Sequence, residues 1–140
     1  MGVADIREDF WQAEGSGIDE LVEAAIRGGR IYADKQLVVT PTLVPYGLRF
    51  SGEIDLTNSH AVAQSLSMAF VLDGDMHLDV SGLIFCDISG IRSFVNAAEA
   101  MDGGRLLLHG LPPLLQKVMK VTGWSDMESL VICRCGVEQR

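Results

Sequence analysis

The residues best suited to chemistry stand in one short stretch, Asp87-Ile88-Ser89-Gly90, which follows an apolar run from Met76 to Cys86. An apolar run that stops at an Asp and passes into an amphipathic segment is typical of a buried strand, a tight loop and the first turn of a helix. Free backbone N–H groups and the positive end of the helix dipole favour anions at such a junction. Asp87 is also a good helix cap, and this structural role alone explains both Asp87 and Ser89.

Ser89 also allows a functional interpretation. A serine beside a carboxylate at a helix N-terminus can accept a phosphoryl group, whose charge the dipole favours and Asp87 opposes. A hydrolase that uses Ser89 is a weaker alternative, because Asp87 stands where a G-x-S-x-G nucleophile elbow has its first glycine. Asp55 ends an earlier strand and joins the same candidate site.

The sequence contains no nucleotide or metal motif. It has no G-x-x-x-x-G-K-[ST] and no G-x-G-x-x-G that opens a helix. His60, His77 and His109 lack a second histidine or carboxylate at metal-ligand spacing, and no second pair completes a ligand set with Cys133 and Cys135. We therefore expect no metal and no cofactor, and we expect the three cysteines to be reduced, structural thiols.

The charge balance excludes several classes of partner. A formal net charge of −8 and the lack of a Lys/Arg cluster argue against nucleic acid binding. No apolar run reaches the roughly 18 residues that a membrane-spanning helix needs, and residues 1–9 carry acids where a signal peptide has basic residues. We expect a soluble, cytoplasmic protein without membrane insertion.

Two parts of the chain differ in composition. Residues 1–29 form an acidic N-terminal extension, in which residues 18–26 place apolar side chains on one face of a short amphipathic helix. That helix either packs on its own domain or serves as a docking or dimerisation element. Residues 30–140 form the main domain.

The main domain alternates between strands and helices of about a dozen residues. The pattern predicts a hairpin (36–40 and 47–56), followed by helices and strands in alternation: 59–70, 76–86, 89–101, 105–109, 112–122 and 130–133. Such alternation requires right-handed crossovers between parallel strands. We therefore predict an α/β fold with a mixed, mostly parallel sheet of four to five strands, surrounded by helices.

Four stretches of this pattern resemble one known family. Ser51–Leu56, Leu78–Arg92, Gly103–Leu106 and Val118–Gly123 are similar, in order and in spacing, to the STAS domain of bacterial anti-sigma factor antagonists. The resemblance covers about residues 37–124. It implies a STAS-like fold, a small sheet with helices around it, in agreement with the predicted order of elements.

The resemblance also implies a function. In that family the antagonist binds an anti-sigma factor, a Ser/Thr kinase of the GHKL type, and so frees a sigma factor for transcription. The kinase can phosphorylate the antagonist in a motif that is commonly Asp-Ser-Ser/Thr-Gly, usually on the residue directly after the Asp. Here that residue is Ile88, whose side chain has no hydroxyl, so phosphorylation at the usual position is excluded. Ser89 matches the second hydroxyl position.

The resemblance therefore implies a non-catalytic regulator of transcription with a GHKL-type anti-sigma factor as its partner. It implies that the partner-binding residues are Asp55, Asp87, Ile88, Ser89, Gly90 and Arg92. Ser89 is then a secondary phosphoacceptor candidate. The alternative is a STAS module that binds a small molecule or lipid, or that acts as a sensory or scaffold domain. The sequence leaves a homodimer open.

Overall fold

The structure, a computed structural model, describes residues 19–70, 74–101 and 103–133. Within this part, residues 19–27 are helical, and Leu21 is fully buried in the main core. This burial favours the interpretation in which the N-terminal helix packs on its own domain. The domain boundary at residue 29 stays a prediction, and residues 1–18 and Cys135 lie outside the described residues.

Six strands form one sheet, and their order in the sheet is their order in the chain, β1-β2-β3-β4-β5-β6. The first three strands pair in antiparallel fashion, and β3 to β6 are parallel. Their bounds are β1 Tyr32–Ala33, β2 Leu37–Leu43, β3 Tyr46–Ile54, β4 Met76–Cys86, β5 Leu106–His109 and β6 Leu130–Cys133.

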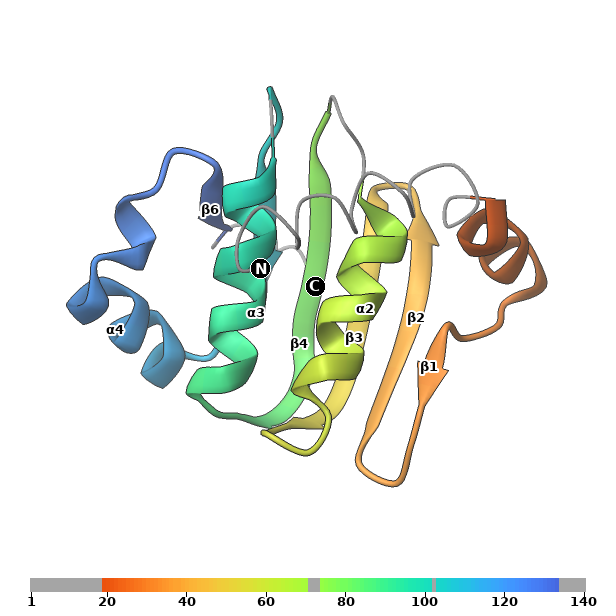
Figure 1. Cartoon of the computed structure of the whole chain (residues 1–140), viewed down its shortest axis with the longest axis horizontal. Coiled ribbons are helices and arrows are strands. Elements are labelled where there is room, and N and C mark those ends of the chain that lie inside the picture. The colour runs from red at the N-terminus through yellow and green to blue at the C-terminus, as the bar shows by residue number, and fades with distance from the viewer. Residues whose placement is uncertain (1–18, 71–73, 102, 134–140) are drawn as a thin grey trace, which may run out of the picture.

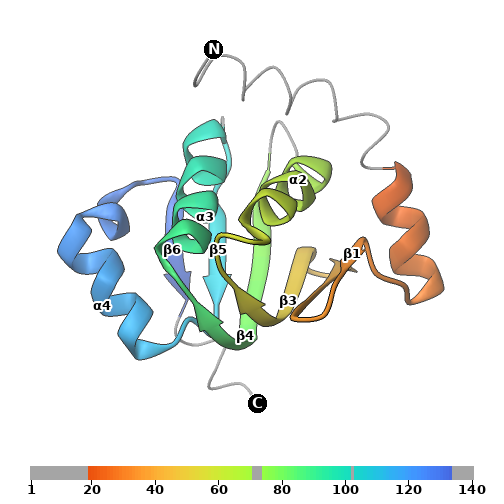
Figure 2. The ribbon, with the colours of Figure 1, turned by 60° about the horizontal axis from the view of Figure 1, so that its bottom comes forward.

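The helices between the parallel strands lie to one side of the sheet. Figure 2 shows α2 (Ser59–Ala69) and α3 (Ile88–Ala100) side by side over one face, while α4 (Pro113–Thr122) lies beside the β6 edge. The short η1 (Trp124–Asp126) leads from α4 to β6, and Figure 1 shows the long β4 at the centre. Right-handed crossovers that all advance in one direction place their helices on the same face of a sheet.

The predicted α/β fold is confirmed, with one strand more than expected. The additional strand is β1, and two residues are too short to show a period in the sequence. The hairpin is also longer than predicted, since β2 continues through Pro41. Its neighbour β1 pairs only with Val38 and Val39, so Pro41 lies at an edge, where a strand tolerates proline.

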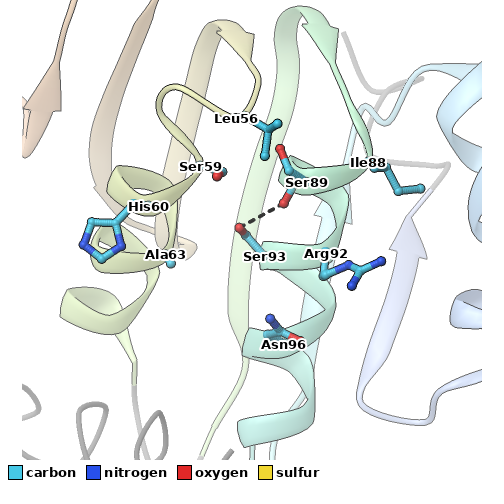
Figure 3. A pocket seen from close by; sticks show the side chains of 9 residues that line it. All are labelled: Leu56, Ser59, His60, Ala63, Ile88, Ser89, Arg92, Ser93 and Asn96. Carbon is cyan, nitrogen blue, oxygen red and sulfur yellow. Dashed lines mark hydrogen bonds between the residues drawn. The ribbon is translucent and has the colours of Figure 1, made fainter. Parts of the chain in front are cut away.

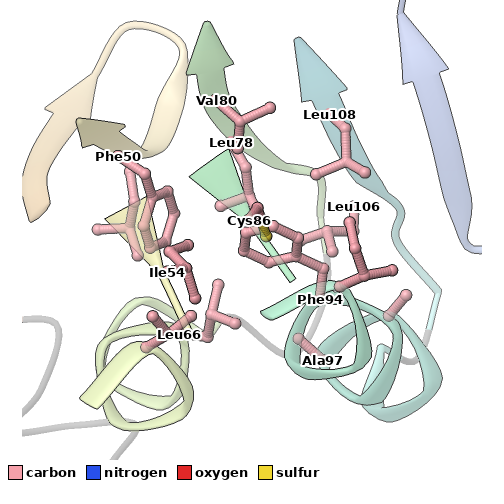
Figure 4. Packing of buried hydrophobic residues seen from close by; sticks show 14 of the residues in the cluster. Phe50, Ile54, Leu66, Leu78, Val80, Cys86, Phe94, Ala97, Leu106 and Leu108 are labelled. Atoms are coloured by element: carbon pink, nitrogen blue, oxygen red, sulfur yellow. The ribbon is translucent and has the colours of Figure 1, made fainter. Parts of the chain in front are cut away.

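Alternating side chains of the central strands meet the inner faces of α2 and α3 in one core (Figure 4). Phe50 of β3 and Phe94 of α3 pack edge to face, with ring centroids 5.4 Å apart. Leu78, Val80 and Leu108 are also fully buried. This packing fixes the ends of β3 and β4 relative to the helices that follow them.

Two histidines meet on the sheet although they are far apart in sequence. His77 Nδ1 and His109 Nε2 lie 2.8 Å apart and share a hydrogen bond, and the rings stack with centroids 5.0 Å apart. Burial lowers the pKa of His77, and the neighbouring His109 lowers it further. In the part of the chain that the structure describes, no group of three or more His, Cys, Asp or Glu side chains can hold a metal ion. None of the helices described there could span a membrane.

Candidate functional site

Asp87 caps helix α3, as the sequence predicts. Its Oδ1 accepts hydrogen bonds from the backbone N–H groups of Ser89 (3.0 Å) and Gly90 (3.2 Å) and from the Ser89 hydroxyl (2.5 Å). Asp87 has extended backbone geometry, and α3 begins at Ile88. The carboxylate thus satisfies two N–H groups of the first turn and fixes the loop around Ile88.

Gly90 is buried where the loop packs against β3 and β4. A Cβ atom at this position would lie 2.6 Å from Cys86 Sγ and 2.6 Å from Ile54 Cγ2, so only glycine fits. Cys86 is itself buried, and this burial raises the pKa of its thiol to about 12. The thiol is therefore an unreactive part of the core.

The loop after β3 repeats the same arrangement. Asp55 Oδ1 accepts from the Thr57 backbone N–H (2.9 Å) and from the Thr57 hydroxyl (2.5 Å), as Asp87 does with Ser89. Asp55 Oδ2 also accepts from the side chain of Gln36, the residue that precedes β2 (3.2 Å). The Thr57 hydroxyl, followed by the Gln36 amide, lowers the pKa of Asp55, so its carboxylate stays ionised at neutral pH.

Asn58 takes the place in this loop that Gly90 takes in the other. Asn58 is only 2% exposed, and its side chain accepts from the Asp55 backbone N–H (3.0 Å) and donates to the Glu53 carbonyl (2.9 Å). These bonds occupy the amide, so Asn58 forms no side-chain cap for α2.

Each loop exposes the apolar residue that stands between its Asp and its hydroxyl residue. Leu56 is 78% exposed and Ile88 is 49% exposed. In Figure 3, Leu56 lies at the mouth of the gap between α2 and α3, whereas Ile88 points to the other side of α3, toward the blue C-terminal segments. Two rigid turns at neighbouring strand ends thus present one apolar side chain each.

A groove of about 480 Å³, lined by both polar and apolar side chains, runs between α2 and α3. Arg92 lines it, is exposed and lies 6.0 Å from the Trp124 ring, within reach of a cation–π contact. No carboxylate among the described residues forms an ion pair with Arg92. The full lining is Leu56, Ser59, His60, Ala63, Ile88, Ser89, Arg92, Ser93 and Asn96.

The hydroxyl of Ser89 is committed to Asp87. His60 lines the same groove, but no hydrogen bond joins it to Ser89 in the described part of the chain. His109 pairs in register with Asp79, and the whole segment Val80–Cys86 separates that position from the loop. The described residues therefore give Ser89 a carboxylate partner and no histidine partner.

The structure brings most of the predicted site residues to one end of the sheet. Ile88, Ser89 and Arg92 line one groove, and Asp87 holds the loop on which Ile88 and Ser89 stand. Asp55 holds the neighbouring loop, and Gly90 is buried. Sequence reasoning missed Leu56 and His60, although the parallel between Asp55-Leu56-Thr57 and Asp87-Ile88-Ser89 was a signal for the former.

Comparisons with known proteins agree with this geometry. A family model described as "Mlab, STAS domain" matches residues 39–132, which is more than half of the chain. Among solved structures, a crystal structure of an anti-sigma factor antagonist from Mycobacterium paratuberculosis matches with a TM-score of 0.52 and 18% identity, over 66% of this chain and 80% of that chain. At this identity the likeness concerns the fold alone. A search among curated proteins finds no match.

Proposed function

The chain belongs to the STAS domain family, and from this membership we propose that it regulates transcription by binding an anti-sigma factor of the GHKL kinase type. The likeness of its fold to an anti-sigma factor antagonist supports this proposal. In this role the protein acts by binding in the bacterial cytoplasm and catalyses no reaction itself.

One observation carries the proposal. Ile88 is half exposed, yet the loop that presents it is fixed by three hydrogen bonds to Asp87 and by the close packing of Gly90. A side chain on a rigid loop loses little conformational entropy when a partner covers it, which favours affinity. Leu56 on the neighbouring loop presents a second exposed apolar side chain, which lies between α2 and α3 and not on the side of Ile88 (Figure 3).

The proposal includes a form of regulation that differs from the usual one. Ile88 has no hydroxyl, so the kinase cannot phosphorylate the position directly after Asp87. Ser89 is half-buried and donates its hydroxyl hydrogen to Asp87 at 2.5 Å, so a phosphoryl group there would replace that bond with repulsion between like charges. Binding thus persists in the presence of the kinase and ATP.

An Ile88→Asp variant tests the contact. We expect affinity for a purified GHKL-type anti-sigma kinase from the same host to fall at least about tenfold, because a charge desolvated at a packed contact is costly. Isothermal titration calorimetry measures this loss. Val44→Asp, at an exposed position of the β2–β3 hairpin, is the matched control and should bind as the wild type does. Equal affinities for both variants would move the contact away from this loop.

Incubation with the kinase and ATP tests the regulation. Intact-mass analysis should show an unmodified protein, or at most a substoichiometric label on Ser89 that disappears in Ser89→Ala. Stoichiometric phosphate on another residue would contradict the proposed regulation.

The groove between α2 and α3 favours a second candidate, a STAS module that binds a small molecule. Its volume of about 480 Å³ and its mixed lining, in which Arg92 and His60 stand beside apolar side chains, suit a small molecule that carries polar groups. Affinity capture from the host separates the two candidates. A GHKL-type kinase in the eluate supports the first, whereas a metabolite or a membrane transport component supports the second.

A further inference from the structure

Strand β4 projects beyond its neighbour β5. β5 pairs only with Met76–Asp79, so within the described residues the segment Val80–Cys86 is paired by β3 alone. The chain leaves the sheet at Gly110, whose φ is +83°. The backbone of Gly110 lies close to Ser81, since a Cβ added to the glycine would be 2.5 Å from Ser81 Cβ. Among the described residues, more than half of the longest strand therefore has no paired strand on the β5 side, where Gly110 lies against it at Ser81.

Two irregularities in the pairing with β3 turn side chains of this segment outward. The register shifts once between Arg49 and Ser51 and again between Gly52 and Glu53, where Ile84 is the extra residue on β4. Bulges of this kind redirect side chains. As a result Ile84 and Phe85, although consecutive, are both exposed, at 82% and 52%.

An apolar groove of about 130 Å³ follows this edge. Its other wall is the start of α4, where Leu114 is 72% exposed. The lining carries no charged residue and consists of Leu83, Ile84, Phe85, Cys86, Pro112, Leu114 and Leu115.

The side chains of this edge lack the charge and the proline that often protect a strand from pairing with another chain, so the two bulges are its main protection. Natural edges carry charged residues, especially lysine, or proline, whereas residues 80–86 read Val-Ser-Gly-Leu-Ile-Phe-Cys. An uncharged, apolar strand segment without proline is a template for a further strand. An exposed edge of this kind promotes aggregation in solution unless another segment covers it in the functional state of the protein.

We propose that the free edge of β4 and its groove bind an extended, apolar segment of the partner protein, which adds to the sheet beside Val80–Cys86 and places side chains between Phe85 and Leu114. The inference rests on the proposed function, and it extends the contact at Ile88 along the strand that precedes it. An extended segment, unlike a helix, satisfies the backbone groups of the edge, and alternate side chains fill the groove.

Charge indicates which partner segments fit. Asp87 directly follows the groove residue Cys86, while Lys117 follows Leu114 by one turn of α4. With a net charge of −8, the chain is repelled by anionic membrane surfaces, so a lipid is a poor occupant. An apolar segment flanked by more basic than acidic residues complements the net negative charge of the chain.

The test uses the full chain and a purified GHKL-type anti-sigma kinase from the same host. Ile84→Lys and Leu114→Glu should each weaken binding at least about tenfold, whereas the matched controls Val44→Lys and Val121→Glu should leave it unchanged. Val121 is exposed on the same helix as Leu114 but outside the groove. Hydrogen exchange should show that backbone amides of residues 80–86 become protected in the complex.

The outcomes separate the two proposals. If the wild type binds but Ile84→Lys binds equally well, or residues 80–86 gain no protection, the edge proposal is overturned and the proposed function stands. If the wild type does not bind the kinase, the proposed function fails and the edge proposal fails with it. Self-association of the wild type that Ile84→Lys abolishes, measured by light scattering at increasing concentration, would make a second copy the occupant and also overturn the proposal.

Discussion

The loops that follow β3 and β4 use the same hydrogen bonds but differ in their fourth residue. In each, an Asp carboxylate accepts from the backbone N–H and the hydroxyl of the residue two positions later, and an apolar side chain between them is exposed. The fourth residue is Asn58 in the first loop and Gly90 in the second. Asn58 binds Glu53 and Asp55 through its side chain, whereas Gly90 brings the backbone against Cys86 and Ile54.

The comparison shows that the same Asp-apolar-hydroxyl loop can be held against the sheet in two ways, which we call its polar and its packing anchor. The β3 loop is held by polar bonds, including one from Gln36, the residue that precedes β2, and it leaves α2 without a side-chain cap. The β4 loop is held by packing, and its Asp caps α3 directly. The two anchors should therefore fail under different changes.

The packing anchor should be the more sensitive one. Gly90→Ala should lower the free energy of unfolding by about 3 kcal/mol, because its Cβ meets two buried atoms at 2.6 Å and overpacking of a core costs about 1–3 kcal/mol. Urea denaturation measures the change. Gly29→Ala is the control, since its Cβ would meet only the Ala24 carbonyl at 3.6 Å. A loss below about 1 kcal/mol would show that the β4 loop is not held by close packing.

The polar anchor should cost less to break. Asn58→Ala should lower the free energy of unfolding by about 2 kcal/mol, because it leaves the Asp55 N–H and the Glu53 carbonyl without their side-chain partner. The same substitution at the exposed Asn96 should change it by less than about 0.5 kcal/mol. If both alanine variants unfold at the same urea concentration, the buried amide does not anchor the loop.

The smallest expected effect on stability comes from the Asp55 carboxylate and should appear only at acidic pH. The pKa of Asp55 is lowered by the Thr57 hydroxyl and then by Gln36, so its contribution to stability is present above the usual carboxyl pKa of about 4 and is lost as the pH falls through the lower, folded value. Asp55→Asn removes this titration. Its unfolding midpoint in urea should therefore fall less than that of the wild type between pH 5 and pH 3. Parallel curves would show that Asp55 does not contribute to acid unfolding.

Hydrophobic periodicity was sufficient to predict the order of elements, because each long helix and strand buries one face. A hydrophobic period cannot be recognised over the two residues of β1, so the sequence did not predict this edge strand. The Asp87 cap was predictable for another reason, since capping is a local preference that acts within three residues.

The features that sequence reasoning missed depend on pairing between strands. The bulges that expose Ile84 and Phe85 are set by the register with β3, and the apolar run alone indicated a fully buried strand. His77 and His109 meet only because β4 and β5 are neighbours in the sheet. The resemblance of four stretches to one family supplied what periodicity could not, namely the end of the sheet at which to look for a partner.

The consecutive strand order has a consequence for how the chain folds. Each strand from β2 onward pairs with the strand that precedes it in the chain, so no pairing between strands has to close a loop longer than one helix and its connections. Loop closure slows folding when contacts are distant in sequence, and a low contact order favours rapid folding. The sheet can therefore grow strand by strand from the β2–β3 hairpin, in the order in which the ribosome releases it.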